Sequence, residues 1–270
     1  MDSGLSSSAG ADVNGAPSEP ATSVDSPFGP PVHGTIRERI RAKLLFLPTS
    51  VAFAFFLVRP RWRLRPREMW IGDSHAMTFN RDIVNSMFLT APEGQFILRA
   101  GARLMFSLGR KGFPPAIART AALVALTRRR GRLIPFFMCG EIDVRAHLVK
   151  HGDDYSFVGE YVERCAALAH QLGATTFYVA VPPPPVDLFA EECWYPITGT
   201  PAERAVAHRR LREELRSAVT TTEGARLLDA TDDLANDEGI MTRDRTVDGC
   251  HTNLEMVARI RERVRAELNG

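Results

Sequence analysis

Short runs of apolar residues alternate with longer amphipathic stretches from residue 68 to the end of the 270-residue chain. Apolar runs bounded by polar or turn-forming residues are typical of strands buried in a sheet. The stretches between them carry apolar residues at helical spacing. The pattern predicts five strands, at 69–71, 95–98, 133–138, 175–181 and 226–229, and five helices, at 76–88, 115–130, 155–172, 201–219 and 253–268.

The alternation of strands and helices determines the predicted fold class. Parallel neighbouring strands need a crossover connection, usually a helix, and the helices then cover both faces of the sheet. The run at 133–138 is apolar almost throughout, as expected for a parallel strand buried on both faces. We therefore predict one three-layer α/β/α domain over residues 68–270, with a central parallel sheet of about five strands.

The first 34 residues have a different composition. They are rich in Ser, Gly, Ala and Pro, and they contain four acidic residues and no Lys or Arg. Such a segment does not bury enough apolar surface to offset the entropy of ordering it, so a disordered tail is predicted for residues 1–34. The segment also lacks the basic start and apolar centre of a secretory signal.

Residues 35–67 form a second, basic segment. Nine Lys or Arg and a single Glu accompany an apolar run at 44–58, which Pro48 interrupts. The run is shorter than the roughly 20 residues that span a bilayer. One interpretation is a helix packed on the domain, and another is a peripheral contact with an anionic membrane surface, with Trp62 at the headgroup level. A signal anchor is a third interpretation, disfavoured by the distance of the run from Met1.

The composition narrows the class of protein. The chain has 34 Lys and Arg against 32 Asp and Glu, and its 44% hydrophobic and 24% charged residues are ordinary for a globular protein. The excess of basic residues is confined to 35–67, so no nucleic-acid partner is predicted. The four cysteines show no Cys-x-x-Cys spacing. They therefore predict free thiols in a cytoplasmic protein, and no metal or cofactor is expected. The protein would also be membrane-associated if residues 35–67 bind a membrane.

Two short polar segments carry the candidate chemistry. Gly72-Asp73-Ser74-His75 follows the first predicted strand directly, and ligands of open α/β sheets bind beyond the carboxyl ends of the strands. A serine at this turn exposes its hydroxyl, with its own N–H and the helix dipole directed at the pocket. Asp248 precedes His251 by three residues, so its carboxylate can bind one imidazole nitrogen and leave the other as a base. Taken alone, each segment is also explained by a helix cap or a surface turn.

Taken together and in this order, the two segments resemble the SGNH (GDSL-type) hydrolase superfamily over residues 68–268. The form Gly72-Asp73-Ser74-His75-Ala76 is similar to SGNH domains associated with the acylation or deacylation of polysaccharides. The resemblance implies a flavodoxin-like fold and a catalytic triad, with Ser74 as nucleophile, His251 as general base and Asp248 as the acid that orients it. It also implies an oxyanion hole from the N–H groups of Ser74 and Gly101, although position 101 is equally explained as an ordinary loop glycine.

The third segment of the family departs from its pattern in this chain. The family has Gly-x-Asn-Asp, whereas this chain reads Gly140-Glu141-Ile142-Asp143, so Ile142 stands in place of the oxyanion-hole Asn. The loss of one such donor typically costs about 2.7–4 kcal/mol of transition-state stabilisation. Arg145 or a rearranged backbone N–H is expected to replace the donor, and a local ion pair or strand-end cap is the alternative. The residues predicted to contact substrate are Asp73, His75, Glu141, Asp143 and Arg145.

These observations favour a serine-dependent ester hydrolase or O-acyltransferase acting on an acylated carbohydrate or a lipid-linked glycan. Hydrolysis and transfer share the acyl-enzyme at Ser74, so the sequence does not separate them. A metal-dependent phosphoesterase is a second hypothesis from Asp73-Ser74-His75, but the Gly-Asp and Gly-Asn-His segments that it needs are absent. A third hypothesis is a non-catalytic glycan-binding or partner module that lost the oxyanion donor at Ile142.

Overall fold

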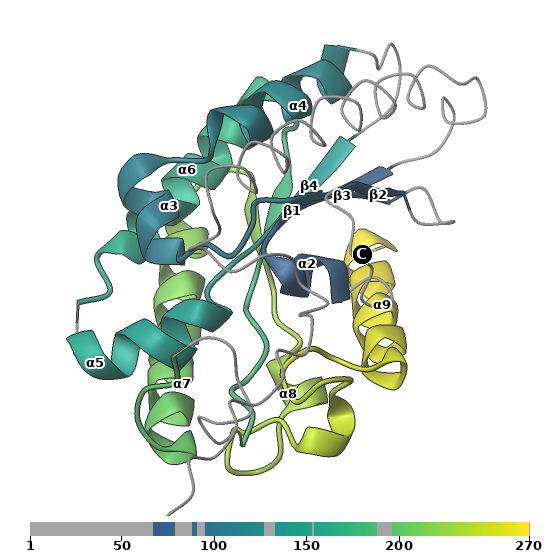
Figure 1. The fold of residues 1–270 in the computed structure, drawn as a ribbon. Helices are drawn as coiled ribbons and strands as arrows, with labels where there is room; N and C mark the ends of the chain where they lie inside the picture. The colour runs from purple at the N-terminus through teal and green to yellow at the C-terminus, as the bar shows by residue number, and fades with distance from the viewer. Residues whose placement is uncertain are drawn as a thin grey trace, which may run out of the picture.

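The computed structural model describes residues 67–78, 88–90, 95–126, 133–152, 154–187 and 196–269. Its centre is a six-stranded sheet in the order β2-β3-β1-β4-β5-β6 (Figure 1). Five strands pair in parallel, as predicted, and β2 is added antiparallel to β3 at one edge. The strands are β1 (Arg67–Gly72), β2 (Phe88–Thr90), β3 (Phe96–Arg99), β4 (Leu133–Met138), β5 (Phe177–Ala180) and β6 (Ala225–Leu228).

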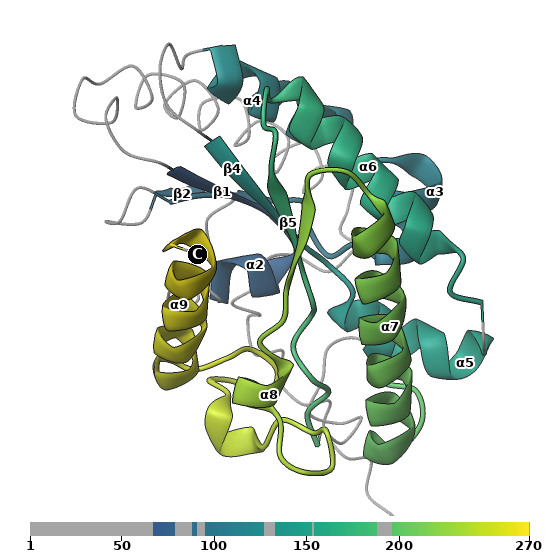
Figure 2. The ribbon, with the colours of Figure 1, turned by 180° about the vertical axis from the view of Figure 1, so that it is seen from behind.

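Helices cover both faces of the sheet, which confirms the three-layer α/β/α architecture (Figures 1 and 2). A π-helical turn, η2 (Asp143–Leu148), leads into the short α5 (Val149–His151). A 3₁₀ turn, η4 (Arg243–Arg245), precedes the last helix. One face carries α3 (Met105–Lys111), α4 (Pro115–Leu126), α6 (Phe157–Gln171) and α7 (Pro201–Thr221), and the other carries α2 (Ser74–Thr78), α8 (Thr231–Leu234) and α9 (Leu254–Asn269).

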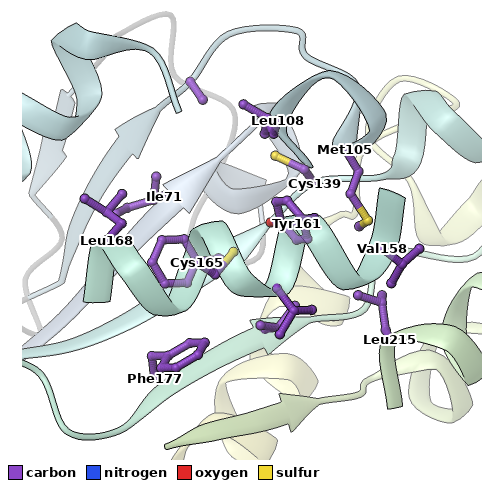
Figure 3. Packing of buried hydrophobic residues seen from close by; sticks show 14 of the residues in the cluster. Ile71, Met105, Leu108, Cys139, Val158, Tyr161, Cys165, Leu168, Phe177 and Leu215 are labelled. Carbon is purple, nitrogen blue, oxygen red and sulfur yellow. The ribbon is translucent and has the colours of Figure 1, made fainter. Parts of the chain in front are cut away.

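Two apolar clusters hold the layers together. Alternate residues of β1 supply both, because successive side chains of a strand point to opposite faces. Met69 and Ile71 belong to the cluster under α3 and α6, which Figure 3 shows around Tyr161. Trp70 belongs to the other cluster, where its ring stacks on Phe136 with centroids 4.6 Å apart. The central strand is therefore buried on both sides, and its carboxyl end is held rigidly.

Gly72 is the last residue of β1, at a point where the backbone of β4 approaches closely. A Cβ atom at this position would lie 1.9 Å from the carbonyl oxygen of Met138. Only a residue without a side chain fits there, because real atoms do not approach so closely and the neighbour is backbone rather than a flexible side chain. The turn that follows β1 thus depends on glycine at position 72.

We expect Gly72→Ala to lower the free energy of unfolding by about 3 kcal/mol, in the upper part of the range for overpacking. Urea unfolding measures the change. Gly159→Ala on α6 is the matched control, because its added Cβ meets no atom within 4 Å and alanine favours a helix over glycine by up to about 1 kcal/mol. Equal stabilities for Gly72→Ala and the unchanged protein would contradict this packing argument.

Two elements differ from the sequence-based expectation. The helix predicted over 76–88 begins at Ser74 and is described to Thr78, but Phe88 already belongs to β2, so the predicted end was wrong. Phe88 pairs with Leu98 of β3, and this tertiary pairing overrides the local helical pattern. The helix α3 was not predicted, and its N-cap residue, Leu104, makes no side-chain hydrogen bond to the helix.

The N-terminal segments fall mostly outside the described residues. The predictions of a tail at 1–34 and of a basic segment at 35–67 concern residues for which the structure describes only Arg67, the first residue of β1. A membrane contact through that segment stays a prediction. Within the described ranges, every helix is too short or too polar to cross a membrane.

Candidate active site

Ser74 lies at the carboxyl end of the central strand, as the first residue of α2. The turn before it is held by two hydrogen bonds. The backbone N–H of Asp73 donates to the carbonyl oxygen of Met138 (3.2 Å), and Oδ1 of Asp73 accepts from the backbone N–H of His75 (2.9 Å). These bonds tie the serine turn to β4 and to the start of its own helix.

The loop before α9 brings His251 to this serine. Nε2 of His251 lies 2.8 Å from Oγ of Ser74, and Nδ1 lies 2.8 Å from Oδ2 of Asp248. Oδ1 of Asp248 also accepts from the backbone N–H groups of His251 (2.8 Å) and Cys250 (3.0 Å). The three predicted triad residues therefore form a continuous serine–imidazole–carboxylate chain.

The surroundings favour the neutral, basic form of this imidazole. Burial lowers the pKa of His251, the hydrogen bond with Asp248 opposes that effect, and the neighbouring His75 lowers the pKa further. Burial raises the pKa of Asp248, but the hydrogen bonds from the His251 side chain and from the backbone N–H groups of His251 and Cys250 outweigh it and hold that pKa at about 2. An ionised carboxylate thus faces one nitrogen of a neutral imidazole, whose other nitrogen is directed at Ser74 Oγ.

Gly101 follows β3, the strand next to β1. Gly72 is paired with Arg99, so Ser74 and Gly101 both lie two residues beyond the same pair at the carboxyl edge of the sheet. Gly101 has a φ of 83°, which an L side chain rarely adopts, although a Cβ atom there would meet nothing within 4 Å. The positive φ therefore explains why position 101 is a glycine. Its position at the same edge of the sheet as Ser74 agrees with the predicted oxyanion hole.

Asp143 lies beyond β4, at the start of η2, and is completely buried. Its Oδ2 accepts from the backbone N–H of Met105 (2.6 Å) and its Oδ1 from that of Phe106 (3.1 Å). The carboxylate thereby caps α3, which has no cap of its own. Since β3 and β4 flank β1, this contact ties together the loops on both sides of Ser74. Asp143 is completely buried and holds the start of α3, so we interpret it as a positioning residue rather than a substrate ligand.

We expect Asp143→Asn to lower kcat for ester hydrolysis by about tenfold or more, with a smaller change in KM. An amide group has only one acceptor oxygen, so one N–H of the α3 terminus loses its partner and the Gly101 loop loosens. Steady-state kinetics measure the effect, and Asp154→Asn on the exposed loop before α6 is the control. An unchanged kcat would show that the cap does not position the site.

Glu141 and Arg145 form a buried ion pair at the end of β4. Nε of Arg145 lies 2.7 Å from Oε1 of Glu141, and Nη2 donates to Oε2 (3.0 Å). Burial raises the pKa of Glu141, but the charge of Arg145 and the hydrogen bond from His75 hold it well below its usual range. The alternative of a local ion pair is thus observed, and a role of the Arg145 guanidinium as the missing oxyanion donor stays a prediction.

His75 and Asp73 flank the serine from the inner side. The ring of His75 stacks on that of His251, with centroids 4.6 Å apart, and its Nε2 lies 3.6 Å from Oε2 of Glu141. Asp73 is 1% exposed, and burial together with the charge of Glu141 raises its pKa to about 7. Asp73 therefore lies beneath the turn, where its carboxyl group supports the serine turn and is screened from a bound substrate.

A pocket opens beside the triad, over the ends of β4 and β5. Arg204 of α7, which the sequence reasoning missed, supports its wall by donating to the carbonyl oxygens of Gly199 (2.8 Å) and Val186 (3.1 Å). The sequence gives no signal for the role of this arginine, because its partners are backbone carbonyl oxygens, which every residue type carries. The lining residues are Glu141, Val144, Arg145, Pro183, Pro184, Pro185, Val186, Ile197, Arg204 and Cys250.

One set of residues in the site has the chemistry of metal ligands. The donor atoms of His75, Cys250 and His251 all lie within 4.8 Å of one another. Sequence spacing does not reveal this set, because His75 and Cys250 are 175 residues apart.

Comparison with known proteins places the fold. No family model and no curated protein matches the sequence. Among solved structures, the chain is similar to a candidate platelet activating factor from Streptococcus pneumoniae, with a TM-score of 0.50, 12% identity, and 85% of this chain and 99% of that chain covered. It is also similar to a carbohydrate esterase family 3 protein from Talaromyces cellulolyticus (TM-score 0.46, 15% identity, 75% and 96% covered). A GDSL-like lipase from Bacteroides thetaiotaomicron is a further neighbour (TM-score 0.45, 9% identity, 81% and 96% covered).

These structural neighbours define the class of the fold. The likeness to the Streptococcus pneumoniae structure shows a shared three-layer α/β/α fold, which is the fold that the resemblance of the serine and histidine segments implies. The identities are low, so the likeness concerns the fold and leaves activity and substrate to be argued from the site.

Proposed function

We propose that this protein is a serine-dependent enzyme that cleaves or transfers acyl groups of carboxylic esters. The observation that carries the proposal is the chain from Oγ of Ser74 through His251 to Asp248, with 2.8 Å at each step. A serine hydroxyl becomes a good nucleophile when a positioned base removes its proton. The likeness to solved esterases and lipases supports the same reaction class.

The reaction follows from this geometry. As Oγ of Ser74 attacks the ester carbonyl carbon, Nε2 of His251 takes the hydroxyl proton, and the imidazolium is stabilised by Asp248. The tetrahedral intermediate collapses, the bond from carbon to the leaving oxygen breaks, and His251 returns the proton to the departing alcohol. Water or an acceptor hydroxyl then attacks the acyl-enzyme with His251 again as base, and Ser74 is released.

The negative oxygen of the intermediate needs hydrogen-bond donors that are already in place. The backbone N–H groups of Ser74 and Gly101 are the donors that the proposal uses, from adjacent strand ends. Ile142 supplies no side-chain donor, and Arg145 is paired with Glu141. The proposed oxyanion hole therefore has two donors rather than three, and we expect a slower acylation step than the family pattern would provide.

The pocket supports a substrate with both polar and apolar parts. Its proline wall offers apolar contacts, while Glu141 and Arg145 at its edge offer acceptors and donors for sugar hydroxyls. The proposed substrate, an acylated carbohydrate or a lipid-linked glycan ester, rests on the resemblance of the serine segment to domains that modify polysaccharides, and Glu141 and Arg145 are its proposed sugar contacts. No nucleic-acid partner is part of the proposal.

A screen of acyl donors, with and without sugar acceptors and followed by mass spectrometry, tests this proposal. The expected result is release of the acyl group from short-chain nitrophenyl esters and from acetylated sugars. Acylated acceptor would identify a transferase, and free acid alone would identify a hydrolase. If no donor is consumed by the wild-type protein, the enzyme proposal is wrong.

The absence of an Asn at position 142 favours one second candidate, a glycan-binding or partner module on the same fold. Such a module needs no activated serine. It is supported if the protein binds acetylated oligosaccharides in calorimetry and Ser74→Ala binds them with unchanged affinity, while neither consumes them.

A further inference from the structure

Four potential metal ligands meet beside Ser74, on the side of the site that faces β4. Nε2 of His75 lies 3.8 Å from Sγ of Cys250 and 3.6 Å from Oε2 of Glu141. Sγ of Cys250 lies 3.9 Å from Oε1 of Glu141. Nε2 of His251, the proposed base, belongs to the same neighbourhood, since the donor atoms of His75, Cys250 and His251 lie within 4.8 Å of one another. An imidazole nitrogen, a thiol sulfur and the two oxygens of one carboxylate are thus neighbouring donors.

The spacing of these donors fits a small divalent cation. Zinc binds nitrogen and oxygen at about 2.0–2.2 Å and sulfur at about 2.3 Å, so tetrahedral ligands lie about 3.4–3.6 Å apart. The three observed separations exceed these values by a few tenths of an ångström. Small side-chain rotations close such a gap. The donors therefore need no backbone rearrangement to surround one ion.

The charges of the cluster also suit such an ion. Glu141 is held ionised by Arg145, and a coordinated thiol loses its proton. The carboxylate, the thiolate and the guanidinium of Arg145 together carry one net negative charge toward the cation. Each carboxylate oxygen has two lone pairs, so Glu141 can keep its contacts with Arg145 while it binds a cation. Nitrogen and thiolate donors favour zinc and similar borderline metals over Mg²⁺ and Ca²⁺, which prefer all-oxygen sites.

We propose that His75, Cys250, Glu141 and His251 form an inhibitory binding site for Zn²⁺. The lone pair of His251 Nε2 that binds the metal is the one that would accept the proton of Ser74, so an occupied site leaves the serine without its base. The metal is therefore a reversible inhibitor rather than a catalytic group. The inhibition rests on the function proposed above, whereas the binding of the metal does not.

Binding is tested on the full-length protein after treatment with EDTA and its removal. We expect calorimetry to show one Zn²⁺ per chain with a dissociation constant in the micromolar range or tighter. Co²⁺ in place of zinc reports the ligands independently of activity, because a thiolate ligand gives an intense charge-transfer band in the near ultraviolet. Cys250→Ala should abolish that band and weaken Zn²⁺ binding by at least about tenfold, and His75→Asn should weaken binding similarly.

His151→Ala is the matched control. His147 and His151 form the neighbouring imidazole pair, with ring centroids 4.3 Å apart, and would bind zinc weakly on their own. The control variant should keep the cobalt band and the tight zinc site. Circular dichroism shows whether each variant is folded. Binding of one tight Zn²⁺ by folded Cys250→Ala and His75→Asn as in the wild type would overturn the proposed site, and so would the absence of tight binding by the wild type.

Inhibition is tested with nitrophenyl acetate, and EDTA should restore the activity that Zn²⁺ removes. Measured against its own activity without metal, Cys250→Ala should need at least about tenfold more Zn²⁺ for half inhibition than the wild-type protein. If the protein has no esterase activity but shows the cobalt band, the metal site stands and the proposed function fails. If it is active and tight zinc binding leaves the activity unchanged, the inhibitory role fails and the proposed function stands.

Discussion

Ser74→Ala is expected to reduce kcat for nitrophenyl acetate hydrolysis by at least about a thousandfold, because the variant lacks the atom that forms the acyl-enzyme. The proposed oxyanion donors are backbone N–H groups and remain in the variant, so KM should change little. The fold should also persist, because Ser74 Oγ contacts His251 at the edge of the site rather than within either apolar cluster. Steady-state kinetics with a thermal unfolding curve measure both expectations.

Ser217→Ala is the matched control for this prediction. Ser217 is an exposed serine of α7, so its loss should leave kcat and KM unchanged. Retention of more than about a tenth of the wild-type kcat by Ser74→Ala would show that the hydrolysis does not proceed through this serine.

His251→Gln is expected to cause a loss of similar size. Glutamine is neutral and has no basic nitrogen at the position of Nε2, so the proton of Ser74 has no acceptor 2.8 Å away. The serine and the histidine act as one unit, so the double variant Ser74→Ala/His251→Gln should be no slower than either single variant. Kinetics of the two single variants and the double variant measure this non-additivity.

His170→Ala, an exposed histidine near the end of α6, is the control for the loss of an imidazole. It should leave the kinetics unchanged. If the losses from Ser74→Ala and His251→Gln multiplied in the double variant, the two residues would act independently and the proposed triad would be wrong.

The five parallel strands could be predicted because each is a short apolar run, and these runs alternate along the chain with amphipathic stretches typical of helices. The serine and histidine segments were recognised for a related reason. Ser74 lies close after the end of a strand. Asp248 and His251 are only three residues apart and contact each other. The local sequence therefore determines most of the geometry within each segment. The pairing of His251 with Ser74, 177 residues away, was implied only by the family resemblance.

The contacts around the triad were not predictable from spacing. The role of Asp143 depends on the backbone N–H groups of Met105 and Phe106, 38 and 37 residues away, which the order β3-β1-β4 brings to the same edge of the sheet. The strand β2 was missed because its pairing with β3 is likewise a tertiary effect. The cluster of His75, Glu141 and Cys250 joins the ends of two strands, β1 and β4, and the distant loop before α9, so no single sequence motif predicts it.

The central claim is that Ser74 is an activated nucleophile, and labelling with a fluorophosphonate probe tests it most directly. The probe forms a covalent bond with an activated serine, and peptide mapping by mass spectrometry identifies that serine. We predict one label per chain on Ser74, no label on Ser74→Ala, and labelling of His251→Gln slowed by at least about a hundredfold. An unlabelled wild-type protein, or a label that persists on Ser74→Ala, would contradict the claim.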